Sequence, residues 1–164
     1  MTRINTLSYL ILPVLGILLF SKYAYAKEFS IPEDAETLQQ HEFYQENGIT
    51  YNRFTNKRFT GYVIYRYQNG NAQAARAYRN GKLHGKSIIF FRDGSVQVVN
   101  HYEDGNLNGP CEGWHQNGQI AFEGQYVDGM QAGLWKEWSP QGELLSRNQY
   151  RRIKEGYEPG PPTS

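Results

Sequence analysis

The residues of this chain that come closest to a metal site are Asp104-Gly105-Asn106-Leu107-Asn108-Gly109, a D-x-N-x-N-G run. The run matches the first six positions of an EF-hand calcium loop, in which oxygen atoms ligate the ion. The twelfth position, where such a loop needs a bidentate glutamate, is His115. The glycines of the run recur elsewhere at a fixed spacing, so we interpret the run as a repeated turn and not as a calcium site.

The histidines are also spaced unfavourably for a metal. No two of them stand two or four residues apart, the spacings that place two imidazoles at one ion; they are His41, His84, His101 and His115. We therefore expect no bound metal and no cofactor.

Catalysis finds no support in the side chains that might act as nucleophile or base. The chain has no G-x-S-x-G motif, and Cys111 falls at a repeated position that other units fill with Val63, Ser87 and Trp135. A position that accepts such different side chains is a packing slot. Glu42 and Glu46 have the spacing of a solvated helix face, so we predict no catalytic residues and no enzyme.

Four series of residues recur at a spacing of 24. Coincident series at one period indicate a repeat architecture, and terminal repeats are commonly irregular. The first unit is degenerate, with Lys57 where a glycine is expected. The series are Gly61, Gly85, Gly109 and Gly133; Gly70, Gly94, Gly118 and Gly142; Gly81, Gly105 and Gly129; and Tyr78, Tyr102, Tyr126 and Tyr150.

Each unit has the pattern of a β-hairpin. Asn69-Gly70, Asp93-Gly94 and Asn117-Gly118 suit two-residue turns in which both central residues need positive φ. The other end of each unit, as in Asn80 to Gly85, is expected to be a wider turn. The predicted fold is mainly β: an elongated antiparallel meander of 24-residue hairpins over residues 47–154. One sheet face would carry Val96, Val98 and Tyr102, and then their counterparts one unit later, Ile120, Phe122 and Tyr126.

Two segments flank the predicted array. Residues 27–46 are expected to be a linker and a short capping helix over Ile31–Glu46, because Pro32 and the acids after it suit a first helical turn. Residues 155–164 are rich in proline and glycine and are expected to be disordered.

The N-terminus has the three parts of a secretory signal peptide. Arg3 precedes an apolar run from Leu7 to Phe20, and Ala24-Tyr25-Ala26 is a small-x-small cleavage site. The run is short for a membrane span, which needs about 20 apolar residues. We predict that residues 1–26 are removed and that the protein is exported, to the periplasm or outside the cell. An uncleaved signal anchor is the alternative, and would be the chain's only attachment to a membrane.

Charge and cysteine content limit the partners further. The net charge of +1 becomes −1 when Arg3 and Lys22 leave with the signal. A nearly neutral chain with mixed signs predicts no nucleic-acid partner. The only local basic cluster is Arg151, Arg152 and Lys154, which is small for binding anionic lipid. The single cysteine, Cys111, excludes an intrachain disulfide.

The repeats resemble the bacterial variant of the MORN repeat, and most closely the YwqK-family antitoxins. The resemblance spans Glu46 to Tyr150 and implies a protein-interaction scaffold. Arg58 stands where that family usually has proline, and the signal peptide suits an immunity-type protein of the envelope better than a cytosolic antitoxin. The motifs that carry it are Gly48-Ile49-Thr50-Tyr51, Phe59-Thr60-Gly61, Asn80-Gly81-Lys82 with Gly85, Asp104-Gly105-Asn106 with Gly109, and Asp128-Gly129 with Gly133 and Trp135.

Three tryptophans are the candidate binding residues: Trp114, Trp135 and Trp138. Trp135 and Trp138 stand three residues apart on one strand and so lie on opposite faces, which leaves at least one of them partly exposed. We expect an exported scaffold that binds another protein, with an antitoxin- or immunity-like role as one form of this function. The alternative is a module that binds carbohydrate or peptidoglycan in the cell envelope, where exposed aromatic rings stack on sugars.

Overall fold

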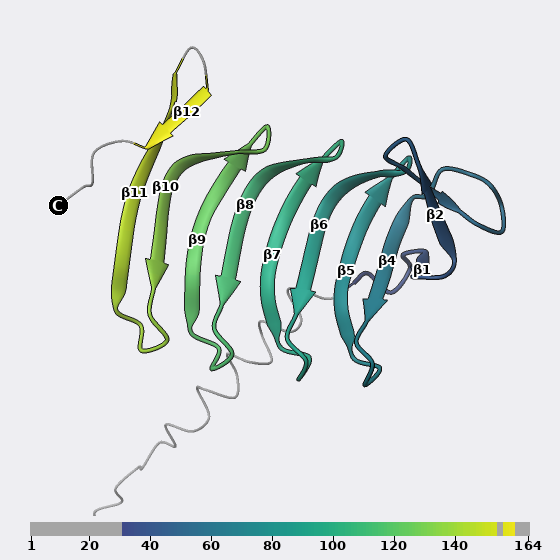
Figure 1. The fold of residues 1–164 in the computed structure, drawn as a ribbon, viewed down its shortest axis with the longest axis horizontal. Helices are drawn as coiled ribbons and strands as arrows, with labels where there is room; N and C mark the ends of the chain where they lie inside the picture. The colour runs from purple at the N-terminus through teal and green to yellow at the C-terminus, as the bar shows by residue number, and fades with distance from the viewer. Residues whose placement is uncertain (1–30, 154–155, 160–164) are drawn as a thin grey trace, which may run out of the picture. The chain divides into compact units, whose positions relative to one another are not determined.

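The computed structural model describes residues 31–153 and 156–159. They form a long antiparallel meander of repeated hairpins, as the sequence predicts (Figure 1). The main sheet has ten strands in the order β1-β4-β5-β6-β7-β8-β9-β10-β11-β12, and β2 pairs with β3 in a second, two-stranded sheet. The predicted signal peptide lies outside the described residues.

The strands that build the repeats are antiparallel, and each pairs with the strands before and after it in the sequence. Figure 1 shows β6, β8 and β10 bending sharply near the upper ends of the hairpins. The strands are β1 (Thr37–Gln39), β2 (Phe43–Glu46), β3 (Ile49–Asn52), β4 (Gly61–Arg66), β5 (Ala72–Arg79), β6 (Lys82–Phe90), β7 (Val96–Glu103), β8 (Asn106–Trp114), β9 (Ile120–Val127), β10 (Met130–Trp138), β11 (Leu144–Ile153) and β12 (Gly156–Pro159).

The predicted turn types are wrong at both ends of the hairpins. At the end predicted to be wide, Asn80-Gly81 forms the two-residue turn: both residues have positive φ, 51° and 82°, and Arg79 pairs with Lys82. At the end predicted to be tight, the Gly70 amide bonds to the Tyr67 carbonyl, and only Gly70 has positive φ. That geometry is a three-residue loop closed by a left-handed glycine. The other units repeat both turns.

A second glycine in each unit bends a strand. Gly85, Gly109 and Gly133 have positive φ inside β6, β8 and β10, next to breaks in the strand register. A β-bulge of this kind kinks the strand and increases its twist. The tyrosine that follows in the sequence then lies opposite such a glycine of the preceding strand, as Tyr102 of β7 does opposite Gly85 of β6. The aromatic column therefore pairs with a column of residues that have no side chain.

The predicted sheet faces need one correction. Val98 pairs with Ile89, but Val96 pairs with the next residue, Phe90, because a bulge shifts the register between them. Since neighbouring residues on a strand point to opposite faces, Val96 and Val98 lie on opposite faces. Ile120 and Phe122 are separated in the same way, because Ile120 pairs with Trp114 and Phe122 with Gly113.

The predicted N-terminal helix is wrong. No helix occurs in the described residues; Pro32 to Ala35 make one turn, and β1 then pairs in parallel with β4. Leu38 and Phe43 are five residues apart and cannot share the apolar stripe of a short helix. As parts of separate strands, both pack into the core, and β1 covers the edge of β4. The segment therefore covers this end of the sheet with a strand.

The core is deepest under this cap. Leu38, Phe59, Val63 and Tyr78 form the buried cluster, with Phe43 among the partly buried residues around it. Burial raises the pKa of the Tyr78 hydroxyl to about 12.

The predicted disordered tail is wrong for Gly156–Pro159. These residues form β12, which pairs with Tyr150–Ile153 of β11. The end of β11 offers unpaired backbone groups, and a short extended segment satisfies them. Among the described residues, no helix is long and apolar enough to cross a membrane.

Candidate binding surface

Trp135 lies in an aromatic cluster on the face of the sheet that carries the repeated tyrosines. Its ring packs edge-on against Tyr126, at 5.0 Å between centroids, and against Tyr150 at 6.5 Å, and it stacks on Phe122 at 6.4 Å. The indole Nε1 donates a hydrogen bond to the Gln125 carbonyl at 3.1 Å. With 6 % of its surface exposed, Trp135 is a core residue and not a contact residue.

Two glycines make room for this cluster. A Cβ on Gly124 would overlap the Trp135 ring, and a Cβ on Gly113 would overlap the Phe122 ring. Neither glycine has positive φ, so the absent side chain, and not the backbone, is what matters there. The units before and after carry Asn100 and Asn148 where this unit has Gly124. The large ring of Trp135 therefore fits on the sheet because residue 124 of β9 is a glycine.

The position of Trp135 is a packing slot throughout the array. Val63, Ser87, Cys111 and Trp135 are all buried. Cys111 donates a hydrogen bond from Sγ to Oδ1 of Asn100 at 2.9 Å. Burial, followed by the charge of Glu112, raises the pKa of the Cys111 thiol to about 11, which keeps it protonated at neutral pH. A protonated, buried thiol is a poor nucleophile.

The other two tryptophans share the opposite face, in a row that we name the apolar row. In it, Trp114 pairs with Ile120, and Trp138 pairs with Leu144. Trp114 is 9 % exposed, Phe90, Val96, Ile120 and Trp138 are partly exposed, and Leu144 at the C-terminal end is the most exposed, at 54 %. The apolar row consists of Phe90, Val96, Trp114, Ile120, Trp138 and Leu144.

Hydrogen bonds between successive loops hold the apolar row in place. Nε2 of His115 lies 2.8 Å from the Trp138 carbonyl, and the Tyr67 hydroxyl donates to the Phe90 carbonyl at the same distance. Tyr67 and His115 occupy the same repeat position, two units apart. His115 therefore acts as a hydrogen-bond donor between loops, a role that its sequence position alone does not reveal.

Asp104, the first residue of the calcium-like run, lies in a two-residue turn. Its carboxylate is 4.0 Å from the Arg79 guanidinium and 3.6 Å from Nδ1 of His84. These are contacts to cationic or ionisable groups of the preceding unit. Residues 31–153 and 156–159 contain no group of three His, Cys, Asp or Glu side chains that could hold a metal ion.

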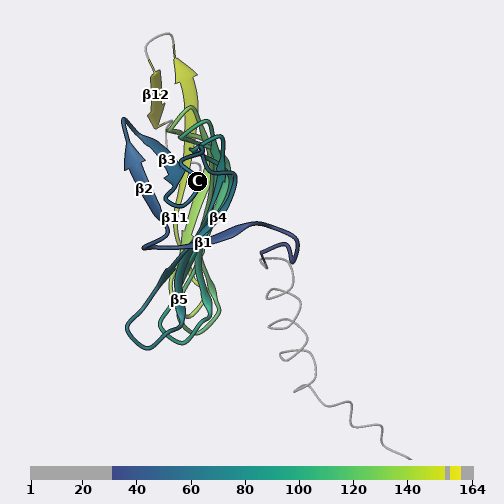
Figure 2. The ribbon, with the colours of Figure 1, turned by 90° about the vertical axis from the view of Figure 1, so that its right-hand side faces the viewer.

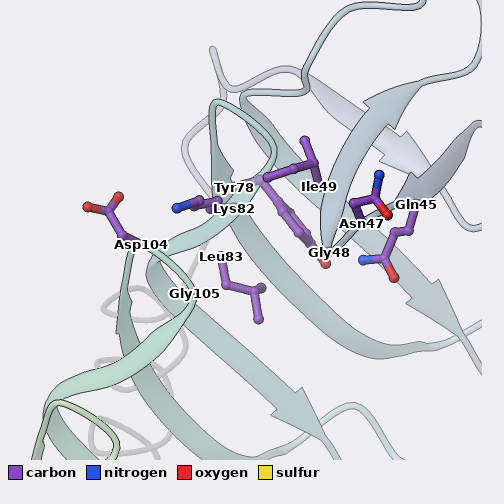
Figure 3. Close-up of a pocket in the computed structure, with 9 residues that line it drawn as sticks. All are labelled: Gln45, Asn47, Gly48, Ile49, Tyr78, Lys82, Leu83, Asp104 and Gly105. Carbon is purple, nitrogen blue, oxygen red and sulfur yellow. The ribbon is translucent and has the colours of Figure 1, made fainter.

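An open pocket of about 220 Å³ lies between the β2–β3 turn and the turns of the next two hairpins. Figure 3 shows Asp104 and Lys82 at one side, Gln45 and Asn47 at the other, and Tyr78 between them. The sequence analysis did not find this pocket, because its walls come from three separate turns. The pocket is open to water, which weakens the electrostatic effects on which catalysis depends.

One segment of the chain matches a known family. Residues 107–128 are a MORN repeat variant. This segment spans the hairpin of β8 and β9, and the other hairpins share its 24-residue spacing, turns and bulges. MORN repeats form non-catalytic β-meander scaffolds, in agreement with the sheet seen here. None of the curated proteins matches the chain.

Three residues at the C-terminal border of the MORN-like array were not recognised from the sequence. Leu144 and Leu145 are 54 % and 65 % exposed. Arg147 is exposed as well, and no carboxylate of the described residues lies within 4 Å of it. The place of Leu144 in the repeat could have indicated its exposure. Its counterparts Val96 and Ile120 are followed by another hairpin of the array, whereas only β12 follows Leu144's strand in the described residues.

Proposed function

We propose that the array is a non-catalytic scaffold that binds another protein through the C-terminal part of the apolar row. The observation that carries this proposal is the exposure of Leu144 beside the partly exposed Trp138. Tryptophan in particular contributes strongly to protein interfaces, and exposed apolar groups that lie together mark interaction sites. The match of residues 107–128 to a scaffold repeat supports the same conclusion.

We propose further that the protein acts outside the cytoplasm. The support is the signal-like pattern of residues 1–26. In that compartment, an antitoxin-like relationship takes the form of an immunity protein that binds an envelope toxin, which the resemblance to YwqK-family antitoxins suggests. Cell fractionation and N-terminal sequencing test this part: we expect a chain that begins at Lys27 in the periplasm or the medium. A full-length chain in the cytoplasm would contradict it.

The binding proposal is tested by protein capture from envelope extracts with matched variants. Trp138→Ala should abolish the capture of one protein that the wild type retains. Phe54→Ala is the control, because Phe54 is 73 % exposed in the loop between β3 and β4 and lies outside the apolar row. Equal capture by the wild type and both variants would contradict the proposal. Trp135→Ala is unsuitable as a test, since Trp135 is buried.

Carbohydrate binding remains the second proposal, because Trp138 is partly exposed. One geometric fact weighs against it: the Lys136 ammonium lies 5.8 Å from the centroid of the Trp138 ring and so occupies one ring face. Sugar stacking needs an open ring face. Sedimentation with purified cell wall distinguishes the two proposals. Wild-type protein that sediments when Trp138→Ala stays in solution would favour the carbohydrate.

A further inference from the structure

Most of β11 has a neighbouring strand on one side only. β10 pairs with Leu144 to Tyr150, whereas β12 pairs only with Tyr150 to Ile153. Figure 1 shows β12 beside the upper end of β11, and no drawn strand along the lower part of β11 on the side away from β10. Within the described strands, residues 144–149 therefore form an open sheet edge. Such an edge presents backbone donors and acceptors to which another strand can pair.

This edge has little of the usual protection, with Arg147 as its single charged residue. Natural edge strands carry lysine, proline or inward charges that prevent pairing. Residues 144–149 contain no lysine or proline, and they begin with the exposed Leu144 and Leu145. At the other end of the sheet, β1 covers the edge of β4. The two borders of the array thus differ, and the C-terminal border is the one left open to a partner.

The register inside the array defines which strand would fit this edge. The counterparts of Arg147 in earlier units are Ala75, Val99 and Glu123. Across to the following strand, they pair with Ile88, Glu112 and Lys136. In the last of these pairs, Lys136 Nζ lies 2.7 Å from Glu123 Oε1. Two of these pairs match in character, apolar Ala75 with Ile88 and acidic Glu123 with basic Lys136, whereas apolar Val99 faces Glu112.

Arg147 occupies this position without an opposite charge. Its partner on β10 is Lys136, a like charge, and no carboxylate of the described residues lies within 4 Å of it. Opposite charges across a strand pair stabilise it, and like charges destabilise it. A strand added outside β11 would satisfy Arg147 by placing Asp or Glu opposite it.

The apolar row defines a second requirement. On β6, β8 and β10, an aromatic residue comes two positions after the residue that pairs with the counterpart of Arg147. These are Phe90 after Ile88, Trp114 after Glu112, and Trp138 after Lys136. The apolar row alternates aromatic and aliphatic residues along the sheet, and Ile120 pairs with Trp114 of the preceding strand. Leu144 has Trp138 on its β10 side and no such residue on its outer side. An added strand with an aromatic residue at this place would cover Leu144.

We propose that the β11 edge binds an extended segment of the partner protein, antiparallel to β11, with an acidic residue opposite Arg147 and an aromatic residue two positions later. This inference rests on the proposed function, and it specifies the place and the kind of segment that binds. The segment Glu112-Gly113-Trp114 in β8 has this pattern and already lies in the corresponding place inside the array, where Glu112 pairs with Val99. That segment supplies a probe of known sequence.

The probe is a synthetic peptide that copies residues 109–114, with serine in place of Cys111 as at Ser87; residues 106 and 107 are left out because their places on β11 are occupied by β12. Hydrogen exchange of the purified protein should show the peptide protecting amides within residues 144–149. Binding should weaken by about fivefold or more with Arg147→Glu, or with lysine in place of Glu112 in the peptide. Combining the lysine peptide with Arg147→Glu should restore binding. Arg147→Glu leaves the fold intact, since Arg147 is exposed and its neighbour Lys136 is cationic.

Two results would overturn the inference. One is an absence of protection within residues 144–149, or a charge exchange that does not restore binding. The other is protection of the same amides by the protein alone at rising concentration, which would make a second copy the occupant. Either result leaves the proposed function separately testable, because the capture experiment with Trp138→Ala does not depend on the peptide.

Discussion

The indole of Trp135 on β10 lies over Gly124 on β9, at a place where any side chain on residue 124 would overlap the ring. Counterpart positions in neighbouring units carry Asn100 and Asn148. The third full hairpin thus has glycine where its neighbours have asparagine, and the absent side chain leaves room for the Trp135 ring. This pair places Trp135 in the core and leaves Trp138, on the opposite face, as the tryptophan available to a partner.

Gly124→Ala should destabilise the protein by about 1–3 kcal/mol, because the added methyl group overpacks the site beneath Trp135. Thermal or urea unfolding measures this change. The control is Trp135→Ser, which restores the residue found at Ser87. In the double variant, Gly124→Ala should cost much less than in the wild type. If the losses of unfolding free energy in the two single variants add up to the loss in the double variant, the two residues are not coupled.

The two exchanges Trp135→Ala and Trp138→Ala should differ in their effect on stability. Trp135→Ala removes a ring that is 6 % exposed and contacts three aromatic residues, and should cost about 3–5 kcal/mol. Trp138→Ala removes a partly exposed ring and should cost about 1 kcal/mol. Urea midpoints compare the two variants directly. Equal losses would mean that the assignment of buried and exposed tryptophans is wrong.

His115→Tyr should be nearly neutral, and His115→Phe should cost about 0.5–1.5 kcal/mol. Tyrosine makes the equivalent bond in the first full hairpin, where the Tyr67 hydroxyl donates to the Phe90 carbonyl. Phenylalanine cannot donate, so the Trp138 carbonyl would lose the bond from His115 Nε2. Chemical denaturation of the two variants measures the difference. If both had the same stability, the hydrogen bond would contribute nothing.

Cys111 should resist alkylation at pH 8 in the folded protein and react when the protein is unfolded in urea. The thiol is 3 % exposed, and burial raises its pKa from 9.0 to about 11. Labelling with iodoacetamide, followed by mass spectrometry, measures the reaction. Equal rates in the folded and the unfolded protein would contradict the burial.

The raised thiol pKa also predicts the direction of a pH effect. The unfolded chain loses the Cys111 proton near pH 9, whereas the folded chain keeps it until about pH 11. The contribution of this group to stability is therefore complete below pH 9 and is lost as the pH rises toward 11. Cys111→Ser should make the fall in unfolding free energy over this range less steep. An unchanged slope would exclude the thiol as the cause.

The repeat could be predicted from the sequence because each 24-residue unit forms one hairpin, so the same turn and strand positions recur at that spacing. The glycines of the predicted series have positive φ in the structure, which explains their recurrence. The type of each turn could not be predicted from its residues. Asn69-Gly70 and Asn80-Gly81 look identical, yet only Asn80 has positive φ. The difference depends on strand pairing around each turn, and a dipeptide does not contain that information.

The remaining errors come from contacts between distant residues. Ile31–Glu46 has good signals for a helix start, but the open edge of β4 pairs with β1 instead. A bulge in each strand puts Val96 and Ile120 on the opposite face of the sheet from Val98 and Phe122. The simple alternation rule therefore assigned them to the wrong face. At the candidate site, three tryptophans were predicted as binding residues, but the sequence did not reveal which one the cluster of Phe122, Tyr126 and Tyr150 buries.

The central claim is that this β-meander binds a protein at its C-terminal border, and site-specific photocrosslinking in living cells tests it most directly. A photoreactive amino acid would replace Leu144 in one protein and Phe54 in another, since both side chains are more than half exposed. We predict one discrete crosslinked product with a second protein from position 144 and none from position 54. The account would be contradicted by the absence of a crosslinked protein at position 144, or by the same product from both positions.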